Sequence, residues 1–145
     1  MCTTVLCCIA FLMLALGSAA QAGPLDEARV KARIQNIAKT DIDALMADYA
    51  DDCVYQWVGG GLDGVYKDKA AIREMWNKFK TNQGGAMEVI PGKVESFTNA
   101  KGVTVITSAH YKGKNEVKVR QVFVYRDGKV VLEIWQIDPN LTIAP

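Results

Sequence analysis

The side chains that could perform chemistry in this chain are one histidine, His110, and a scattered set of tyrosines, tryptophans and glutamines. Histidine is the one side chain whose ordinary pKa lies near neutral pH, so His110 could serve as a general base. A single histidine cannot form a multi-histidine metal site. The sequence also has no glycine-rich phosphate loop and no Gly-x-Ser-x-Gly motif. We therefore expect no metal and no cofactor.

These polar and aromatic side chains are expected to line one pocket that binds a small molecule. Each could stack on an apolar ligand or exchange a hydrogen bond with it. The candidates are Tyr49, Tyr55, Trp57, Trp76, His110, Gln121 and Gln136. For Tyr49 and Trp76 a place in the hydrophobic core is the alternative, and for His110 an exposed position on a strand.

Three helices are expected in the first half of the chain. Apolar residues recur at helical spacing over residues 25–39, over 41–49 and over 69–83. Asp41, or Thr40 before it, suits the N-cap of the second helix. Asp68 suits the N-cap of the third.

The remaining segments are expected to be strands. A short hairpin of residues 53–58 and 62–66 separates the second and third helices, and glycines 59–61 form its turn. Longer strands follow over residues 87–98 (bent at Pro91-Gly92), 103–112, 116–126 and 129–138. This order predicts an α+β fold, with three N-terminal helices and a short hairpin in the concave face of a curved, mainly antiparallel four-strand meander.

The Asp127-Gly128 pair predicts a two-residue turn in the last hairpin. Continued without interruption, the Arg126–Lys129 pair places Gln121 and Gln136 on the inner face of the sheet. The outer face then carries Val122, Val124, Trp135 and Ile137. A half-apolar outer face predicts a homodimer through this surface.

The direction of His110 depends on the preceding hairpin loop at residues 113–115. A two-residue loop would place His110 on the same inner face as Gln121. A three-residue loop would place it on the outer face, because a shift of one residue reverses every side chain of a strand.

Three stretches resemble the SnoaL-like branch of the nuclear transport factor 2-like superfamily. They are Asp41 to Trp57, Gly64 to Ile72, and Asp127-Gly128-Lys129-Val130. The resemblance covers nearly all of residues 23–145 and implies a cystatin-like cone, often dimeric. The superfamily houses isomerases, dehydratases, cyclases, epoxide hydrolases and inert ligand binders, so the resemblance indicates the fold better than the chemistry.

Within that superfamily the pattern of ketosteroid isomerase is only partly present. Its tyrosine donor matches Tyr49, but its aspartate base falls on Trp57 and its second acid falls on Gln121. The expected function is therefore non-catalytic binding of a small apolar or carbonyl-containing ligand. The alternative is a cofactor-independent lyase or isomerase, with His110 as base and Tyr49 and Gln121 as hydrogen-bond donors.

The N-terminus predicts export. An apolar run from Val5 to Leu16 is followed by Ala20-Gln21-Ala22, which is typical of a signal-peptide cleavage site. Residues 1–22 are thus expected to be a signal peptide and 23–145 one domain, in a periplasm or outside the cell. Only Cys53 would remain, so no internal disulfide is expected. The net charge of +1 comes from interspersed charges, which argues against nucleic acid as a partner, and no membrane segment would remain.

Overall fold

The computed structural model describes residues 27–143, so the predicted signal peptide lies outside the described residues. The helices are α1 (Glu27–Lys39), α2 (Ile42–Asp48) and α3 (Lys69–Gln83), with one 3₁₀ turn, η1 (Gly60–Leu62). The strands are β1 (Tyr49–Val58), β2 (Gly64–Lys67), β3 (Glu88–Pro91), β4 (Glu95–Asn99), β5 (Gly102–Lys112), β6 (Glu116–Arg126) and β7 (Lys129–Ile137). No helix in this part of the chain is long and apolar enough to cross a membrane.

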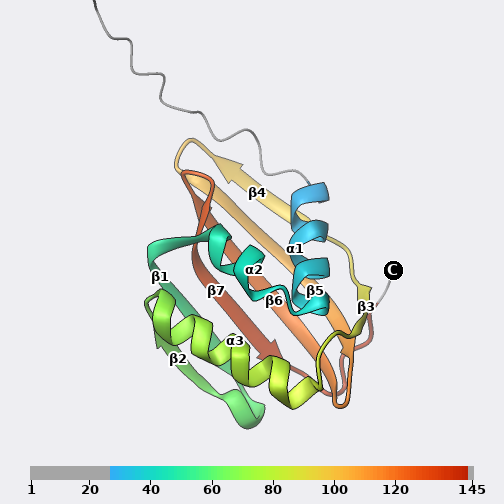
Figure 1. Ribbon diagram of the computed structural model, residues 1–145. Helices are drawn as coiled ribbons and strands as arrows, with labels where there is room; N and C mark the ends of the chain where they lie inside the picture. The colour runs from blue at the N-terminus through green and yellow to red at the C-terminus, as the bar shows by residue number, and fades with distance from the viewer. Residues whose placement is uncertain (1–26, 144–145) are drawn as a thin grey trace, which may run out of the picture.

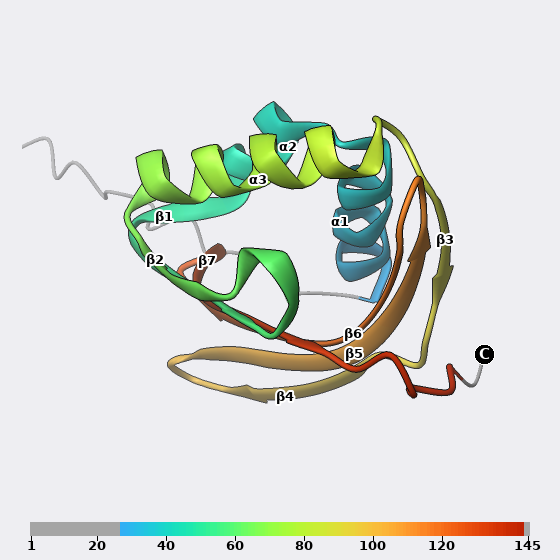
Figure 2. The ribbon, with the colours of Figure 1, turned by 90° about the horizontal axis from the view of Figure 1, so that it is seen from below.

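All seven strands join one sheet. Six follow the order β2-β1-β7-β6-β5-β3, and β4 pairs with the first half of β5, whereas β3 pairs with its second half. The sheet curls around the three helices, which occupy its concave side (Figures 1 and 2). The predicted α+β cone is confirmed. The predicted meander is extended, because β1 pairs in parallel with β7 and so brings the short hairpin into the sheet.

Local capping explains where the helices begin and end. The carboxylate of Asp41 accepts a hydrogen bond from the Ala44 N–H, and Asp68 caps α3 in the same way through Ala71. Gly84 ends α3 in the left-handed conformation, which glycine adopts without strain. The second helix is shorter than predicted, since Tyr49 already has extended backbone and begins β1.

The last hairpin contains a bulge that reverses the predicted faces of β7. Arg126 pairs with Lys129 as expected, but Val131 is an extra residue, so Val124 pairs with Leu132. Beyond the bulge every residue of β7 faces the opposite way. Gln136 is therefore exposed on the convex face and Trp135 is fully buried, so both predictions for these two residues are wrong.

The β5–β6 loop also settles the direction of His110. Lys112 pairs with Glu116, so the loop has three residues and Gln121 lies opposite Thr107 on the concave face. His110 pairs with Lys118 and lies on the convex face. The prediction that His110 faces the interior is therefore wrong. The proposed base lies on the opposite side of the sheet from Gln121.

Candidate functional site

A pocket of about 250 Å³ opens where the β5–β6 loop meets the C-terminal end of α3, and we call it the mouth pocket. One wall is η1, whose Gly60 and Gly61 leave open space where other residues would have side chains. Phe79 and Asn82 of α3 line it too, as do Val117 of β6 and Ile137 of β7. Its volume lies slightly below the usual range for ligand sites, about 300–1,000 Å³, and so suits a small molecule.

The aromatic side of the mouth pocket is formed by Trp57 and Phe79, whose ring centres are 5.4 Å apart. Trp57 also packs on Trp135 and on Tyr55, so it connects the pocket to the aromatic core. Its indole Nε1 is buried and has no hydrogen-bond partner. A buried donor of this kind is uncommon in proteins.

The polar rim of the pocket is held by bonds between α3 and the β5–β6 loop. The amide oxygen of Gln83 accepts a hydrogen bond from the Asn115 N–H at 3.2 Å. The side-chain amide of Asn115 donates to the carbonyl of Asn82 at 2.8 Å. These bonds fix the three-residue loop, so the rim is preformed and a ligand would lose little free energy in ordering it.

A wider hollow of about 620 Å³ lies between α2 and α3. Its charged side chains already form ion pairs, from Arg73 to Asp43 at 2.7 Å and from Lys69 to Asp51 at 3.0 Å. The helix surface there is open to solvent, whereas the mouth pocket is bordered by two aromatic rings and has a hydrogen-bonded polar rim. We therefore take the mouth pocket as the candidate site.

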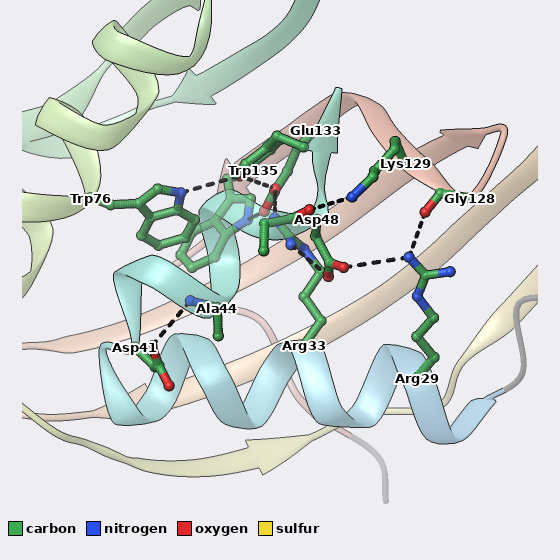
Figure 3. Close-up of polar contacts among 12 residues, drawn as sticks. Arg29, Arg33, Asp41, Ala44, Asp48, Trp76, Gly128, Lys129, Glu133 and Trp135 are labelled. Atoms are coloured by element: carbon green, nitrogen blue, oxygen red, sulfur yellow. Dashed lines mark hydrogen bonds and ion pairs between the residues drawn. The ribbon is translucent and has the colours of Figure 1, made fainter. Parts of the chain in front are cut away.

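Behind the pocket a buried carboxylate, Glu133, organises the core (Figure 3). It accepts hydrogen bonds from the Arg33 guanidinium at 2.6 Å, the Tyr49 hydroxyl at 2.5 Å and the Trp135 indole at 2.7 Å. The Tyr49 hydroxyl in turn accepts from the Trp76 indole at 3.1 Å. A buried charge is tolerated when it is paired and hydrogen-bonded in this way.

The buried network shifts the proton affinities of Arg33 and Tyr49. Burial by itself would lower the pKa of Arg33, but the charge of Glu133, its hydrogen bond to Arg33 and the nearby tyrosines together outweigh burial and hold the pKa well above its usual value. Burial, and then the charge of Glu133, raise the pKa of Tyr49. Tyr49 therefore keeps its proton and directs it at Glu133, so this hydroxyl is committed to the core and not to a ligand.

Four buried tyrosines predict a loss of stability in alkali. Burial raises the pKa of Tyr49, Tyr55 and Tyr111 above the usual value, and that of Tyr125 to about 12. In the unfolded chain a tyrosine ionises near pH ~10. Above that pH the unfolded state releases protons that the folded state retains, so stability falls as pH rises from about 10 to 12.

Urea unfolding at pH 9, 10 and 11 measures this loss. Tyr125→Phe should make the free energy of unfolding fall less steeply with pH, by up to about 1.4 kcal/mol per pH unit. It should not destabilise the protein at pH 7, because the Tyr125 hydroxyl has no hydrogen-bond partner. If the free energy of unfolding fell equally steeply with pH in Tyr125→Phe, the raised pKa of Tyr125 would be contradicted.

The structure separates the seven residues expected to form one pocket. Trp57 lines the mouth pocket, whereas Tyr55 and Trp76 are buried in the core next to it. The Tyr49 hydroxyl donates a hydrogen bond to Glu133. Gln121 is fully buried, and its side-chain amide donates to the Tyr111 hydroxyl at 3.1 Å. The other two candidates, His110 and Gln136, lie on the convex face.

Sequence reasoning missed several residues that matter here. Arg33 lies three residues after Val30 in the apolar stripe of α1, and a charge in such a stripe is a signal for a buried acidic partner. Its partner Glu133 gave no signal, since the uninterrupted register placed it on the outer face. The rim residues Gln83 and Asn115 occur where a helix ends and a loop turns, and nothing in their spacing shows that they meet.

Comparison with known proteins agrees with this fold. The SnoaL-like domain family matches residues 30–133. No match was found among curated proteins. A ketosteroid isomerase-like protein from Erwinia carotovora atroseptica is 20% identical, with a TM-score of 0.61 over 77% of this chain and 92% of that one.

Two further solved structures have the same architecture. An NTF2-like protein from Pseudomonas putida is 20% identical, with a TM-score of 0.61 over 76% of this chain and 84% of that one. A protein from Nostoc punctiforme with a cystatin-like fold is 17% identical, with a TM-score of 0.60 over 79% and 90%. At such identities the likeness establishes the fold, and the chemistry has to be argued from the residues.

Proposed function

The chain belongs to the SnoaL-like family, and we propose that it binds a small, mainly apolar molecule in the mouth pocket without transforming it. The observation that carries this proposal is a pocket bordered by the rings of Trp57 and Phe79, with a polar rim held in place by the hydrogen bond between Gln83 and Asn115. The rings favour an apolar body, and the neutral amide side chains of Asn82, Gln83 and Asn115 at the rim favour a ligand with one neutral polar group, such as a carbonyl oxygen.

Binding is favoured over catalysis by the choice of groups around the pocket. Among the described residues that line it, Glu116 is the one titratable side chain, and 68% of that side chain is exposed to solvent. A general acid or base works best when its proton affinity is tuned by burial or by neighbouring charges. His110, the base expected from the sequence, is on the convex face and does not line the pocket.

Substitutions at Gly61 test whether the mouth pocket binds ligands. A Cβ at this position has no atom within 4 Å, and its φ lies outside the left-handed region. Gly61→Phe should therefore fill the pocket without disturbing the fold, and Gly61→Ala should leave room for a ligand. Calorimetric titration with 4-methylacetophenone should show binding to the wild type and Gly61→Ala, and none to Gly61→Phe. Equal binding by all three proteins would exclude the mouth pocket as the binding site.

We also propose that the protein forms a homodimer through the convex face of the sheet. The exposed large apolar side chains of the described residues are Val58, Val65, Phe97 and Ile106. Strand alternation and pairing place all four on this face, where Ile106 continues into a row with Val122 and Ile134. A second copy presents the same patch, so two-fold packing would cover both at once.

The dimer proposal replaces Trp135 and Ile137 of the predicted interface with these exposed residues. Ile106→Lys should convert the dimer to a monomer with little change in stability, because 42% of Ile106 is already exposed. Sedimentation equilibrium of the wild type and the variant measures the change. A wild type that stays monomeric at high concentration would refute the interface.

Export is likewise a proposal, supported by the apolar run of residues 5–16 and the Ala20-Gln21-Ala22 site. N-terminal sequencing of the exported protein should begin at Gly23. Retention of residues 1–22 would overturn it.

A further inference from the structure

We propose that the side-chain N–H groups of Gln83 bind the polar group of the ligand in the mouth pocket, and that this group is a neutral acceptor, such as the carbonyl oxygen of a ketone, aldehyde or ester. The pocket then selects a carbonyl compound over a hydrocarbon of the same shape. This inference rests on the proposed function, because it names the residue that recognises the ligand of the same pocket.

The oxygen of the Gln83 side chain already has a fixed partner. It accepts the hydrogen bond from the Asn115 N–H at 3.2 Å. It also lies close to Gly113, where a Cβ would be only 2.7 Å away from it. The bond to Asn115 distinguishes the two ends of the amide, because only the oxygen accepts from a backbone N–H. The nitrogen is attached to the same planar carbon, so it points away from this bond.

The nitrogen of the Gln83 amide has two N–H donors and no hydrogen-bond partner in the described part of the chain. It is not among the enclosed polar atoms of that part that lack a partner, so it keeps contact with solvent. Gln83 is only 4% exposed and lines the mouth pocket. Phe79, one helical turn earlier on the same face of α3, lines the pocket too. The pocket is therefore where these N–H groups meet solvent.

The burial of Gln83 makes its donors selective. Water pairs with them before a ligand binds, and a ligand that displaces this water has to replace its hydrogen bond or lose affinity. A carbonyl oxygen replaces that bond, whereas a hydrocarbon leaves a buried donor unpaired. Asn82 and Asn115 are exposed, so water still reaches their side chains when a ligand is bound. Selectivity for the acceptor is thus expected to come mainly from Gln83.

The residues of the pocket favour a neutral acceptor over an anion. None of the described residues that line it is a lysine or an arginine. A carboxylate placed against Gln83 would leave water without gaining a counter-charge, and burial of an unpaired charge costs far more than burial of a hydrogen-bonded carbonyl. The expected ligand is therefore an uncharged carbonyl compound.

Three compounds of similar shape test this selectivity: the ketone 4-methylacetophenone, the hydrocarbon 4-isopropenyltoluene, in which a CH₂ group replaces the carbonyl oxygen, and the anion 4-methylbenzoate. NMR titrations at pH 8 measure the three affinities. We expect the wild type to bind the ketone at least as tightly as the hydrocarbon, although the hydrocarbon gains more free energy by leaving water. The benzoate should bind most weakly.

Gln83→Glu keeps an oxygen that can hold Asn115 and replaces the N–H donors with a second acceptor, ionised at a pH well above the ordinary pKa of glutamate. It should lower the affinity for the ketone relative to that for the hydrocarbon by about tenfold. Gln83→Met removes the loop contact as well as the donors, and should lower the same ratio about fivefold.

Asn77→Asp is the matched control for the added charge. Asn77 is exposed on the same helix, α3, and does not line the pocket. The ratio of the two affinities should stay at the wild-type value in this variant.

A measurement on the wild type does not depend on how the variants fold. The side-chain amide protons of Gln83 should move downfield when the ketone binds, because they then donate to its carbonyl oxygen, and far less when the hydrocarbon binds. Amide protons that respond equally to both compounds would contradict the proposed hydrogen bond.

The outcomes separate this inference from the proposed function. A ratio that is unchanged in Gln83→Glu would overturn the role of Gln83 and leave the pocket as a binding site. A ratio that falls only in Gln83→Met would overturn it too, since the effect would then come from the loop. Tighter binding of the benzoate than of the ketone would overturn the neutral acceptor. Binding of none of the three compounds would overturn both proposals.

Discussion

Arg33→Met should destabilise the protein by about 3–5 kcal/mol, because it leaves the buried carboxylate of Glu133 without its counter-charge. Arg33 is 1% exposed and Glu133 is fully buried, so water cannot replace the lost partner. Natural domains have only about 5–15 kcal/mol of stability, so the loss is a large share of the total. Urea unfolding at pH 7 measures it.

Arg29→Met is the matched control for this prediction. Arg29 lies one turn earlier on α1 and contacts Asp48 at 3.4 Å, but its side chain is 36% exposed. We expect it to cost about 1 kcal/mol. The double variant Arg33→Met, Glu133→Gln should recover part of the loss, because no charge then remains unpaired. If Arg33→Met cost no more than Arg29→Met, the ion pair would not stabilise the core.

Trp135→Ala should destabilise the protein by about 3–5 kcal/mol, as expected for the loss of a large buried aromatic side chain. Trp135 is fully buried and its ring packs on those of Trp57, Trp76 and Tyr111. Its indole N–H also donates to Glu133, so the variant leaves one carboxylate oxygen short of a donor. Thermal and urea unfolding both report the change.

Gln136→Ala is the control, and it tests the bulge in β7 as well. Gln136 is exposed, so its replacement should change stability by no more than about 0.5 kcal/mol. If Trp135→Ala fails to fold, Trp135→Phe keeps most of the packing and removes only the bond to Glu133. A larger effect at Gln136 than at Trp135 would indicate the uninterrupted register instead.

Most of the architecture could be predicted from local signals. The caps at Asp41 and Asp68 and the Asp127-Gly128 turn occur where expected, because each depends on a few adjacent residues. Asp127 and Gly128 both have positive φ, as a tight two-residue hairpin turn requires. Membership of the family could also be inferred, since the resemblance covers most of the chain and the family matches residues 30–133.

The site was harder to predict, because it depends on two single-residue shifts. The bulge at Val131 has no glycine or proline to mark it. It is stabilised by distant groups, since it buries Trp135 and brings Glu133 to Arg33 on α1. The third residue of the β5–β6 loop is held by Gln83, another contact distant in sequence. Each shift reverses a whole strand face, so His110 and Gln136 were placed wrongly together with their neighbours.

The indole N–H resonances of the three tryptophans give the most direct test of ligand binding in the mouth pocket. Trp76 donates to Tyr49 and Trp135 donates to Glu133, whereas the Trp57 N–H is unpaired. In a two-dimensional ¹H–¹⁵N spectrum, with Trp57 assigned from Trp57→Phe, titration with 4-methylacetophenone should shift the Trp57 resonance, because Trp57 lines the pocket, and should shift the other two far less. An unmoved Trp57 resonance at saturating ligand would contradict the proposed site.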